Sequence, residues 1–274
     1  MKKKCNRTVR ALAAVLVIAC SLSGLYAKDK KKGDSGKVKT IIVGTGNAFK
    51  PYCYLDDNGN LKGYEKDVLD RIDGLLPQYK FEYETFTFKD ILIALSAGKI
   101  DIGAHQYETN PERRKNYLFS DETYTSFILY VTVLNKNTTI NGIDDLRGKT
   151  VLATIGSNES YVLEQYNKSH ADNPIKLNYL SSPSNEQVVA GMQNGTWDAF
   201  VTIKREVERY NKQYNVGFKS VGEPIATSYT YYIFAKGNTE LKDAVDGALR
   251  QLKQSGELSK ISIQDLGADY TQNE

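Results

Sequence analysis

Arg113 and a polar turn near residue 157 are the residues best suited to bind a small charged molecule. Arg113 lies in the run Asn110-Pro-Glu-Arg113-Arg, and its guanidinium can hold a carboxylate through two parallel hydrogen bonds, which a lysine cannot do. The segment Gly156-Ser157-Asn158-Glu159 follows a predicted strand and begins a predicted helix, where free backbone N–H groups favour an anion. The alternatives are a surface arginine at a helix start, and a Ser157 or Asn158 that only caps its own helix.

Signatures of enzymes and cofactors are weak or missing. The chain has two histidines, His105 and His170, and no Cys or His pair has the spacing of zinc ligands. No P-loop and no Gly-x-Ser-x-Gly motif occurs. Gly44-Thr-Gly46 begins a dinucleotide fingerprint, but Phe49 stands at the third glycine position and Pro51 interrupts the following helix. We therefore expect no enzyme activity, no metal and no cofactor.

Strands and helices are predicted to alternate along the chain. Apolar residues at 68, 69, 72, 75 and 76 have helical spacing, and short apolar runs bounded by glycine predict buried strands. Strands are expected at residues 40–44, 79–85, 100–104, 127–134, 149–154, 175–180, 196–202, 216–221 and 229–235, and helices at 63–76, 88–97, 157–167, 183–194, 204–213, 240–253 and 258–265. This order predicts an α/β protein with parallel-type sheets covered on both faces.

Two long predicted strands, at 127–134 and 229–235, indicate crossings between two lobes. We expect lobe 1 to comprise residues 38–131 and 233–270, and lobe 2 residues 132–232. A cleft would then lie between the lobes at the carboxyl ends of strands, where open α/β sheets bind ligands.

The first twenty residues have the layout of a secretory signal. Basic residues precede a short apolar run at 11–19 that is too short to span a membrane. Val17-Ile18-Ala19-Cys20 is similar to a bacterial lipobox, which predicts a signal peptide at 1–19 and acylation of Cys20, for example by palmitate. The alternative is an ordinary signal cleaved after Ala27. Residues 20–37 are short, polar and lysine-rich, and they predict a flexible tether to the membrane.

The basic excess of the chain is confined to these first segments. The whole chain carries a formal charge of +3, but residues 1–19 hold five basic and no acidic side chains and residues 20–39 a further net +4. The part of the chain from residue 40 onward therefore carries a formal net charge of −6, which argues against nucleic acid as a partner.

Cysteine usage leaves no intrachain disulfide. If Cys5 is removed with the signal and Cys20 carries lipid, Cys53 is alone. We expect Cys53 to be a small buried apolar residue, with a reactive thiol as the alternative.

The block from Phe88 to Tyr124 resembles a known family. It contains residues 88–95, Gly98-Lys-Ile-Asp-Ile-Gly, the Arg113 motif and Phe119-Ser-Asp-Glu-Thr-Tyr124. Segments at 43–51, 58–65 and 249–261 agree in order and spacing. Over residues 38–270 the chain is similar to the polar amino-acid family (family 3) of bacterial ABC-transporter solute-binding proteins, and most to its cystine-binding branch. The resemblance implies a two-lobed periplasmic-binding-protein-like fold of type II, with two hinge strands between the lobes.

The resemblance also implies the binding residues. In the family the arginine at the place of Arg113 holds the ligand α-carboxylate, and the turn around Ser157 and Asn158 closes over the same group. Phe49 and Phe88 stand where the ligand side chain is held between two apolar groups, and each has an ordinary core position as the alternative. The remaining expected ligand-binding residues are His105, Gln106, Glu108, Thr154 and Glu159. The alternative for His105 is a hydrogen-bonded structural histidine.

One departure from the family pattern concerns the ligand ammonium group. After the strand at 198–202 many relatives have an aspartate that pairs with the ammonium, whereas this chain has Ile203. An unpaired ammonium in a closed cleft is costly. We expect Glu108, or less so Glu159, to supply the missing charge.

These observations predict a lipid-anchored, extracytoplasmic, monomeric receptor that binds a polar amino acid, possibly L-cystine. It would lie on the periplasmic side in a cell with two membranes, and deliver its ligand to an ABC permease. The alternatives are an amino-acid sensor of the chemoreceptor type and, on the same fold, a dehydratase-like enzyme.

Overall fold

The computed structural model describes residues 37–272. The predicted signal peptide, Cys20 and nearly all of the predicted tether lie outside these residues. Within the described range, no helix is both long enough and apolar enough to cross a membrane.

The largest sheet has seven strands and contains both long strands. Its order is β11-β8-β12-β6-β1-β5, with β7 paired to β12. β1 is parallel to β5 and β6, whereas β12 is antiparallel to β6, β7 and β8, and β8 is antiparallel to β11. The sheet is therefore mixed where parallel sheets were predicted. The bounds are β1 Lys39–Thr45, β5 Tyr79–Thr85, β6 Ile102–Glu108, β7 Tyr117–Phe119, β8 Thr125–Leu134, β11 Phe200–Thr202 and β12 Phe218–Ala235.

Two smaller sheets complete the strands. β9 (Thr150–Thr154) is parallel to β10 (Lys176–Leu180). β2 (Ala48–Phe49), β3 (Cys53–Leu55) and β4 (Leu61–Lys62) form an antiparallel sheet. This last sheet was not predicted, because its strands are too short to show alternation.

The predicted helices begin and end close to their predicted positions, whereas the short helices at Pro111–Asn116 and Ile143–Leu146 were not predicted. Thr87 and Ser184 cap α2 and α5 through hydrogen bonds from Asp90 N and Gln187 N. Gly98 follows α2 with φ +68°, the left-handed conformation expected after a helix C-cap. The bounds are α1 Tyr64–Leu75, α2 Phe88–Ser96, α3 Pro111–Asn116, η1 (a 3-10 helix) Ile143–Leu146, α4 Asn158–Ser169, α5 Asn185–Gln193, α6 Lys204–Tyr214, α7 Thr239–Gln254 and α8 Glu257–Leu266.

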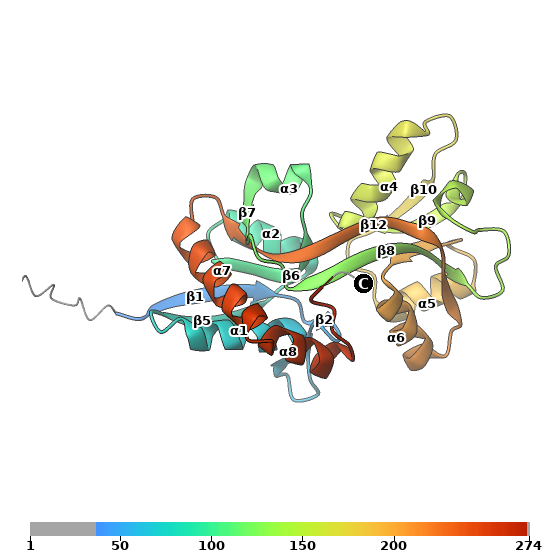
Figure 1. Cartoon of the computed structure of the whole chain (residues 1–274). Helices are drawn as coiled ribbons and strands as arrows, with labels where there is room; N and C mark the ends of the chain where they lie inside the picture. The colour runs from blue at the N-terminus through green and yellow to red at the C-terminus, as the bar shows by residue number, and fades with distance from the viewer. Residues whose placement is uncertain (1–36, 273–274) are drawn as a thin grey trace, which may run out of the picture. The chain divides into compact units, whose positions relative to one another are not determined.

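Two lobes share the long strands β8 and β12 (Figure 1). One lobe carries β1–β7 with α1–α3, α7 and α8, and the other carries β9–β11 with α4–α6. The strands predicted separately at 216–221 and 229–235 are one strand, β12, with a register shift between Val221 and Ala226. Gly222 and Pro224 suggest a turn in the sequence, but here they lie in a bulge of a continuing strand.

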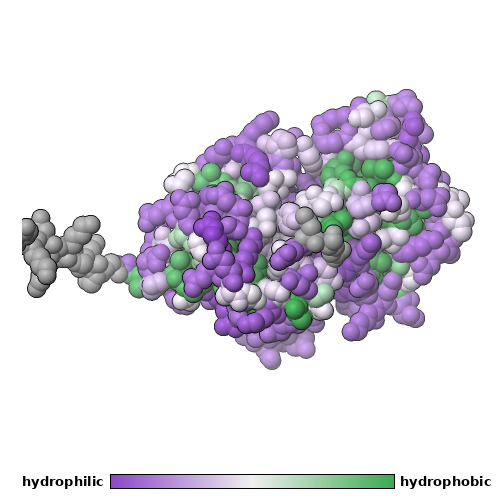
Figure 2. Space-filling view, in the orientation of Figure 1, coloured by the Kyte–Doolittle hydropathy of each residue, from purple (hydrophilic) through white to green (hydrophobic). Residues whose placement is uncertain are grey.

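Apolar side chains fill three buried clusters, while polar residues cover most of the face in Figure 2. The largest cluster includes residues of both lobes, for example Val43 and Val151. Cys53 is buried and not in a disulfide, and burial raises the pKa of its thiol well above the usual value. This fits the prediction of a small apolar core residue.

Arg205 connects the lobes beside the hinge strands. This residue of α6 hydrogen bonds to the Tyr52 hydroxyl and, at 2.9 Å, to the Ser126 carbonyl of β8. Its guanidinium lies 4.6 Å from the ring centre of Tyr270. The Ser126 N–H in turn donates to the Tyr270 carbonyl at 2.7 Å, so the C-terminal segment takes part in this junction.

Candidate functional site

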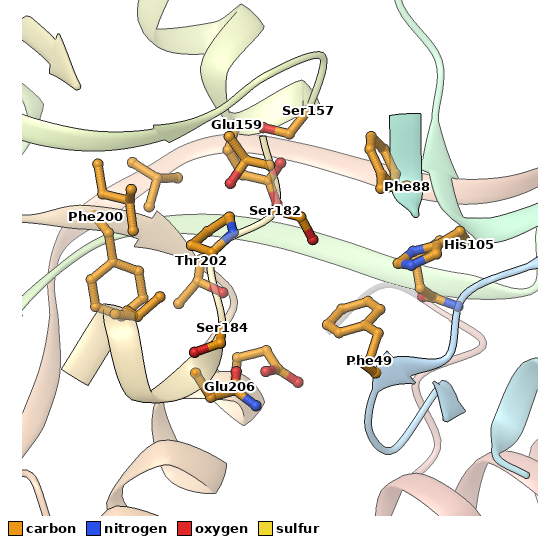
Figure 3. A pocket seen from close by; sticks show the side chains of 18 of the residues that line it. Phe49, Phe88, His105, Ser157, Glu159, Ser182, Ser184, Phe200, Thr202 and Glu206 are labelled. Carbon is orange, nitrogen blue, oxygen red and sulfur yellow. The ribbon is translucent and has the colours of Figure 1, made fainter. Parts of the chain in front are cut away.

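A cleft of about 600 Å³ lies between the lobes, and all ten residues predicted to bind ligand line it. They are Phe49, Phe88, His105, Gln106, Glu108, Arg113, Thr154, Ser157, Asn158 and Glu159. Figure 3 shows Phe49, Phe88 and His105 on one side of the gap, and Ser157, Glu159, Ser182, Ser184, Thr202 and Glu206 on the other. The volume is in the range of small-molecule sites.

Three rings form the lobe 1 wall of the cleft. Phe49 ends β2, Phe88 begins α2 and His105 lies in β6. The His105 ring is stacked on Phe49 at 5.3 Å and edge-on to Phe88 at 5.1 Å. Burial lowers the pKa of His105, so its imidazole is neutral at pH 7. The wall is thus apolar and uncharged.

Packing explains the two glycines of the incomplete dinucleotide motif. A Cβ added to Gly44 would lie 2.4 Å from Ile100 Cδ1, and one added to Gly46 would lie 2.3 Å from His105 Nε2. Gly46 therefore allows the His105 ring to take its place in the aromatic wall.

Arg113 lies on α3 with its guanidinium in the cleft and 7 % of its surface exposed. Nη1 donates to the Glu108 carbonyl and Nη2 to the Gly156 carbonyl of the other lobe, both at 2.7 Å. The guanidinium also stacks over Phe88 and Tyr107 at 5.6 and 5.3 Å. These hydrogen bonds use two of its five N–H groups, so three are left for a carboxylate.

The N-terminus of α4 faces Arg113 from lobe 2. Ser157 caps the helix, since its Oγ accepts from Ser160 N at 3.2 Å, and its own N–H donates to the Thr154 carbonyl at 3.1 Å. Among the described residues, the N–H groups of Asn158 and Glu159 make no backbone hydrogen bond. The amides left for an anion are therefore those of Asn158 and Glu159.

Glu108 is 2 % exposed at the end of β6. Its Oε1 accepts hydrogen bonds from Asn158 Nδ2 at 2.9 Å and from the Ser228 hydroxyl, and no hydrogen bond reaches Oε2 from the described residues. Burial and the nearby Glu159 charge raise the pKa of Glu108 to about 8. Oε2 is the oxygen left to pair with a cation, and that cation would replace the proton that the raised pKa keeps on the group near pH 7.

Glu65, a residue not predicted for the site, accepts hydrogen bonds from Gln106. Glu65 is fully buried on α1, and its Oε1 accepts from Gln106 N at 2.5 Å, Gln106 Nε2 at 3.2 Å and the Tyr124 hydroxyl at 2.6 Å. Gln106 has a backbone φ of +50°, a value that is uncommon for residues other than glycine and asparagine. The carboxylate therefore compensates for an unfavourable backbone conformation beside the cleft.

The lobe 2 wall holds polar residues that the sequence did not single out. Ile203 is buried at the start of α6, but Glu206, one turn later, lines the cleft together with Arg209. Serines of the β10–α5 loop and residues of α5 and α6 complete this wall, namely Ser181, Ser182, Ser184, Asn185, Glu186, Tyr210, Gln213 and Tyr214. The sequence gives no signal for these residues because only the tertiary packing of α5, α6 and the β10–α5 loop brings them to one wall.

No cluster of three or more His, Cys, Asp or Glu side chains within residues 37–272 is placed to hold a metal ion. The site geometry instead combines a partly unused guanidinium, two amides without backbone partners, the half-bonded carboxyl group of Glu108 and an aromatic wall formed by Phe49, Phe88 and His105. This arrangement is suited to binding a small molecule that has both an anionic and a cationic group.

The chain belongs to the bacterial extracellular solute-binding proteins, family 3, whose profile matches residues 41–267. Two-lobed binding proteins of this kind confirm the predicted fold class. The chain is similar to the L-cystine-binding protein TcyK of Bacillus subtilis, with 34 % identity over 271 residues that cover 99 % of each protein.

Two solved structures are also similar. One is a putative L-cystine ABC transporter protein from Listeria monocytogenes, with 39 % identity and a TM-score of 0.80 over 86 % of this chain and 99 % of that one. The other belongs to work on glutathione import through GshT and the cystine importer TcyBC of Streptococcus mutans. It has 26 % identity and a TM-score of 0.79, and the match covers 86 % of this chain and 98 % of that one.

Proposed function

We propose that this protein is the receptor of an amino-acid ABC importer and that it binds a polar amino acid, first of all L-cystine, in the cleft between its lobes. The names of its relatives support an importer role and this ligand. The observation that carries the proposal is the convergence of Arg113 and the Asn158 and Glu159 amides from opposite lobes. The ligand carboxylate would be held by both, and the ligand ammonium by Oε2 of Glu108.

The mechanism we propose is lobe closure without chemistry on the ligand. Contacts from both lobes favour the closed form, and the difference in ligand affinity between open and closed forms sets the population. Arg113 already donates a hydrogen bond to the Gly156 carbonyl of the other lobe, so the protein itself has one contact across the cleft before the ligand binds. The closed form would dock on the permease.

Lipid anchoring is the second part of the proposal. Acylation at Cys20 after removal of residues 1–19 would hold the receptor, as a monomer, on the extracytoplasmic face of the membrane. Mass spectrometry of the membrane fraction should find a diacylated or triacylated N-terminal cysteine. An unmodified N-terminus at residue 28 would contradict this part.

The test of the ligand is a thermal-shift screen of the twenty amino acids, L-cystine and glutathione, followed by calorimetry. A ligand at a hundred times its Kd should stabilise the fold by ~2.7 kcal/mol. Recovery of the unchanged ligand after incubation, checked by mass spectrometry, separates a receptor from an enzyme. If no amino acid raises the melting temperature, the proposal fails. A sensor in place of a transporter would bind the ligand but would not support its uptake by cells.

A further inference from the structure

The cleft extends well beyond Arg113, to a second pair of opposite charges on α6. Glu206 and Arg209 both line it, and Arg209 Nη2 lies 2.7 Å and Nε 2.9 Å from Glu206 Oε2. Figure 3 places Glu206 on the lobe 2 side, across the gap from Phe49. The two charged ends of the cleft therefore use different elements, α3 with β6 at one end and α6 at the other.

Glu206 is only 4 % exposed, and one of its oxygens has no protein partner. Both hydrogen bonds from Arg209 go to Oε2. Oε1 receives none from the described residues and is not among their fully buried unbonded atoms, so it reaches the cleft. An ionised carboxylate in such a place gains most from a cationic partner.

Arg209 also has capacity left. Its guanidinium donates to Glu206, to Asn185 Oδ1 at 3.2 Å and to Gln213 Oε1 at 3.1 Å. These are four hydrogen bonds from five N–H groups, which leaves one for an anion. Ser182 also lines the cleft, and its hydroxyl makes no hydrogen bond within the described residues.

The two ends therefore have the same chemistry. At one end Glu108 keeps a free Oε2 beside Arg113, and at the other Glu206 keeps a free Oε1 beside Arg209. Glu159 and Glu186 also line the cleft, and the Glu186 Oε1 is bonded to the Tyr214 hydroxyl at 2.9 Å. A single amino acid has one ammonium and one carboxylate, and it can satisfy only one of these two ends.

We propose that Glu206 and Arg209 form a second subsite, which binds the far amino-acid end of an extended ligand that has two such ends. The inference rests on the proposed function and specifies its substrate class: molecules with two zwitterionic ends, joined by an apolar or sulfur-containing middle that packs on the aromatic wall. Glu206 Oε1 accepts from the second ammonium, and the remaining N–H of Arg209 donates to the second carboxylate.

Calorimetry with three probes tests the subsite. L-Cystine has both ends, S-methyl-L-cysteine has one, and the mixed disulfide of L-cysteine with 3-mercaptopropionate lacks only the second ammonium. A hydrogen bond to a charged group contributes about 1.5–3 kcal/mol, so the unaltered protein should bind the mixed disulfide about 10- to 100-fold more weakly than cystine.

Glu206→Gln should weaken cystine binding by a similar factor and leave the affinities for both other probes within about threefold. Glu208→Gln is the matched control, because Glu208 is exposed on the same helix and does not line the cleft. Its affinities should equal those of the unaltered protein. The probe comparison on the unaltered protein remains decisive if Glu206→Gln does not fold.

The subsite is rejected if cystine and the mixed disulfide bind equally to the unaltered protein, or if Glu206→Gln weakens all three probes alike. In either case, binding of S-methyl-L-cysteine would leave the receptor function intact. If none of the three probes binds, the subsite is rejected and L-cystine is excluded as the ligand, while the screen of the other amino acids still decides the receptor function.

Discussion

At the scale of single residues, the site is a set of charged groups whose partners are only partly supplied by the protein. Arg113 keeps three N–H groups and Glu108 keeps one oxygen without a protein partner. Removing either group should change how strongly the other binds the ligand, because both lie in a poorly solvated cleft where unpaired charges are costly.

If Arg113 binds the ligand carboxylate as proposed, replacing it by alanine should weaken ligand binding by about 3–5 kcal/mol, because the buried carboxylate would lose its bidentate partner. Arg113→Lys keeps the positive charge but loses the two parallel N–H donors of the guanidinium, so the loss of affinity should be smaller than for Arg113→Ala. Calorimetry with L-cystine measures both. Arg114→Ala is the control, since Arg114 is exposed and should leave the affinity unchanged; equal losses for Arg113→Ala and Arg114→Ala would remove Arg113 from the site.

The contribution of Glu108 to the stability of the ligand-free protein should fall as the pH rises from about 5 to 8. The pKa of Glu108 is raised from 4.5 to about 8 by burial and by Glu159, so in this window the folded state holds a proton that the unfolded state has lost. Chemical denaturation across this range measures the slope. Glu108→Gln should flatten the slope, and an unchanged slope would show that another group is responsible.

Ligand binding at pH 7 should release up to about one proton if the ligand ammonium pairs with Glu108. A cation at Oε2 favours the carboxylate, so a group that is protonated in the free protein loses its proton on binding. Calorimetry in two buffers of different ionisation enthalpy counts the protons. Release that persists in Glu108→Gln would assign the ammonium to a different partner.

The residues predicted from sequence all line one cleft, but the sequence could not reveal their partners. Arg113 and the α4 N-terminus have recognisable local patterns, a charged residue in a turn and a cap before a helix. The Glu65 contact with Gln106 and the Glu206–Arg209 pair depend on tertiary packing, which leaves no local periodicity to detect.

At the scale of elements, hydrophobic periodicity was a good guide where elements are long. α1, β5 and α2 begin and end within one residue of the predicted positions, because each has a clear apolar face and a cap or proline at its end. The short strands β2, β3, β4 and β7 were missed, and β12 was split in two. In these cases long-range pairing overrides the local signals of glycine and proline.

Gly46→Ala should destabilise the protein by about 1–3 kcal/mol, because the new methyl group would overlap the His105 ring. Gly74→Ala provides the matched control. A Cβ at Gly74, inside α1, meets nothing within 4 Å, so this change should stabilise by about 0.5–1 kcal/mol. Urea denaturation measures both changes, and a neutral Gly46→Ala would mean that the aromatic wall can rearrange freely.

At the scale of the whole molecule, one large apolar cluster contains residues from both lobes. Lobes that share a core and two continuous strands are expected to unfold together rather than one after the other. The chain has a single tryptophan, Trp197, which is 6 % exposed in the lobe 2 cluster, so it reports on that lobe alone.

Urea unfolding followed by Trp197 fluorescence and by far-UV circular dichroism should therefore give the same midpoint. Saturating ligand should move both midpoints upward together, because the ligand binds only the folded pair of lobes. Two separate midpoints would show that the lobes are independent folding units.

The contact between Arg205 and the Tyr270 ring has a practical consequence for anyone who handles this protein. A truncation that removes Tyr270 would remove its contacts with Arg205 and Ser126 at the joint between the lobes. A variant ending at residue 267 should therefore show a changed ligand dissociation rate in stopped-flow experiments, although every residue lining the cleft is retained.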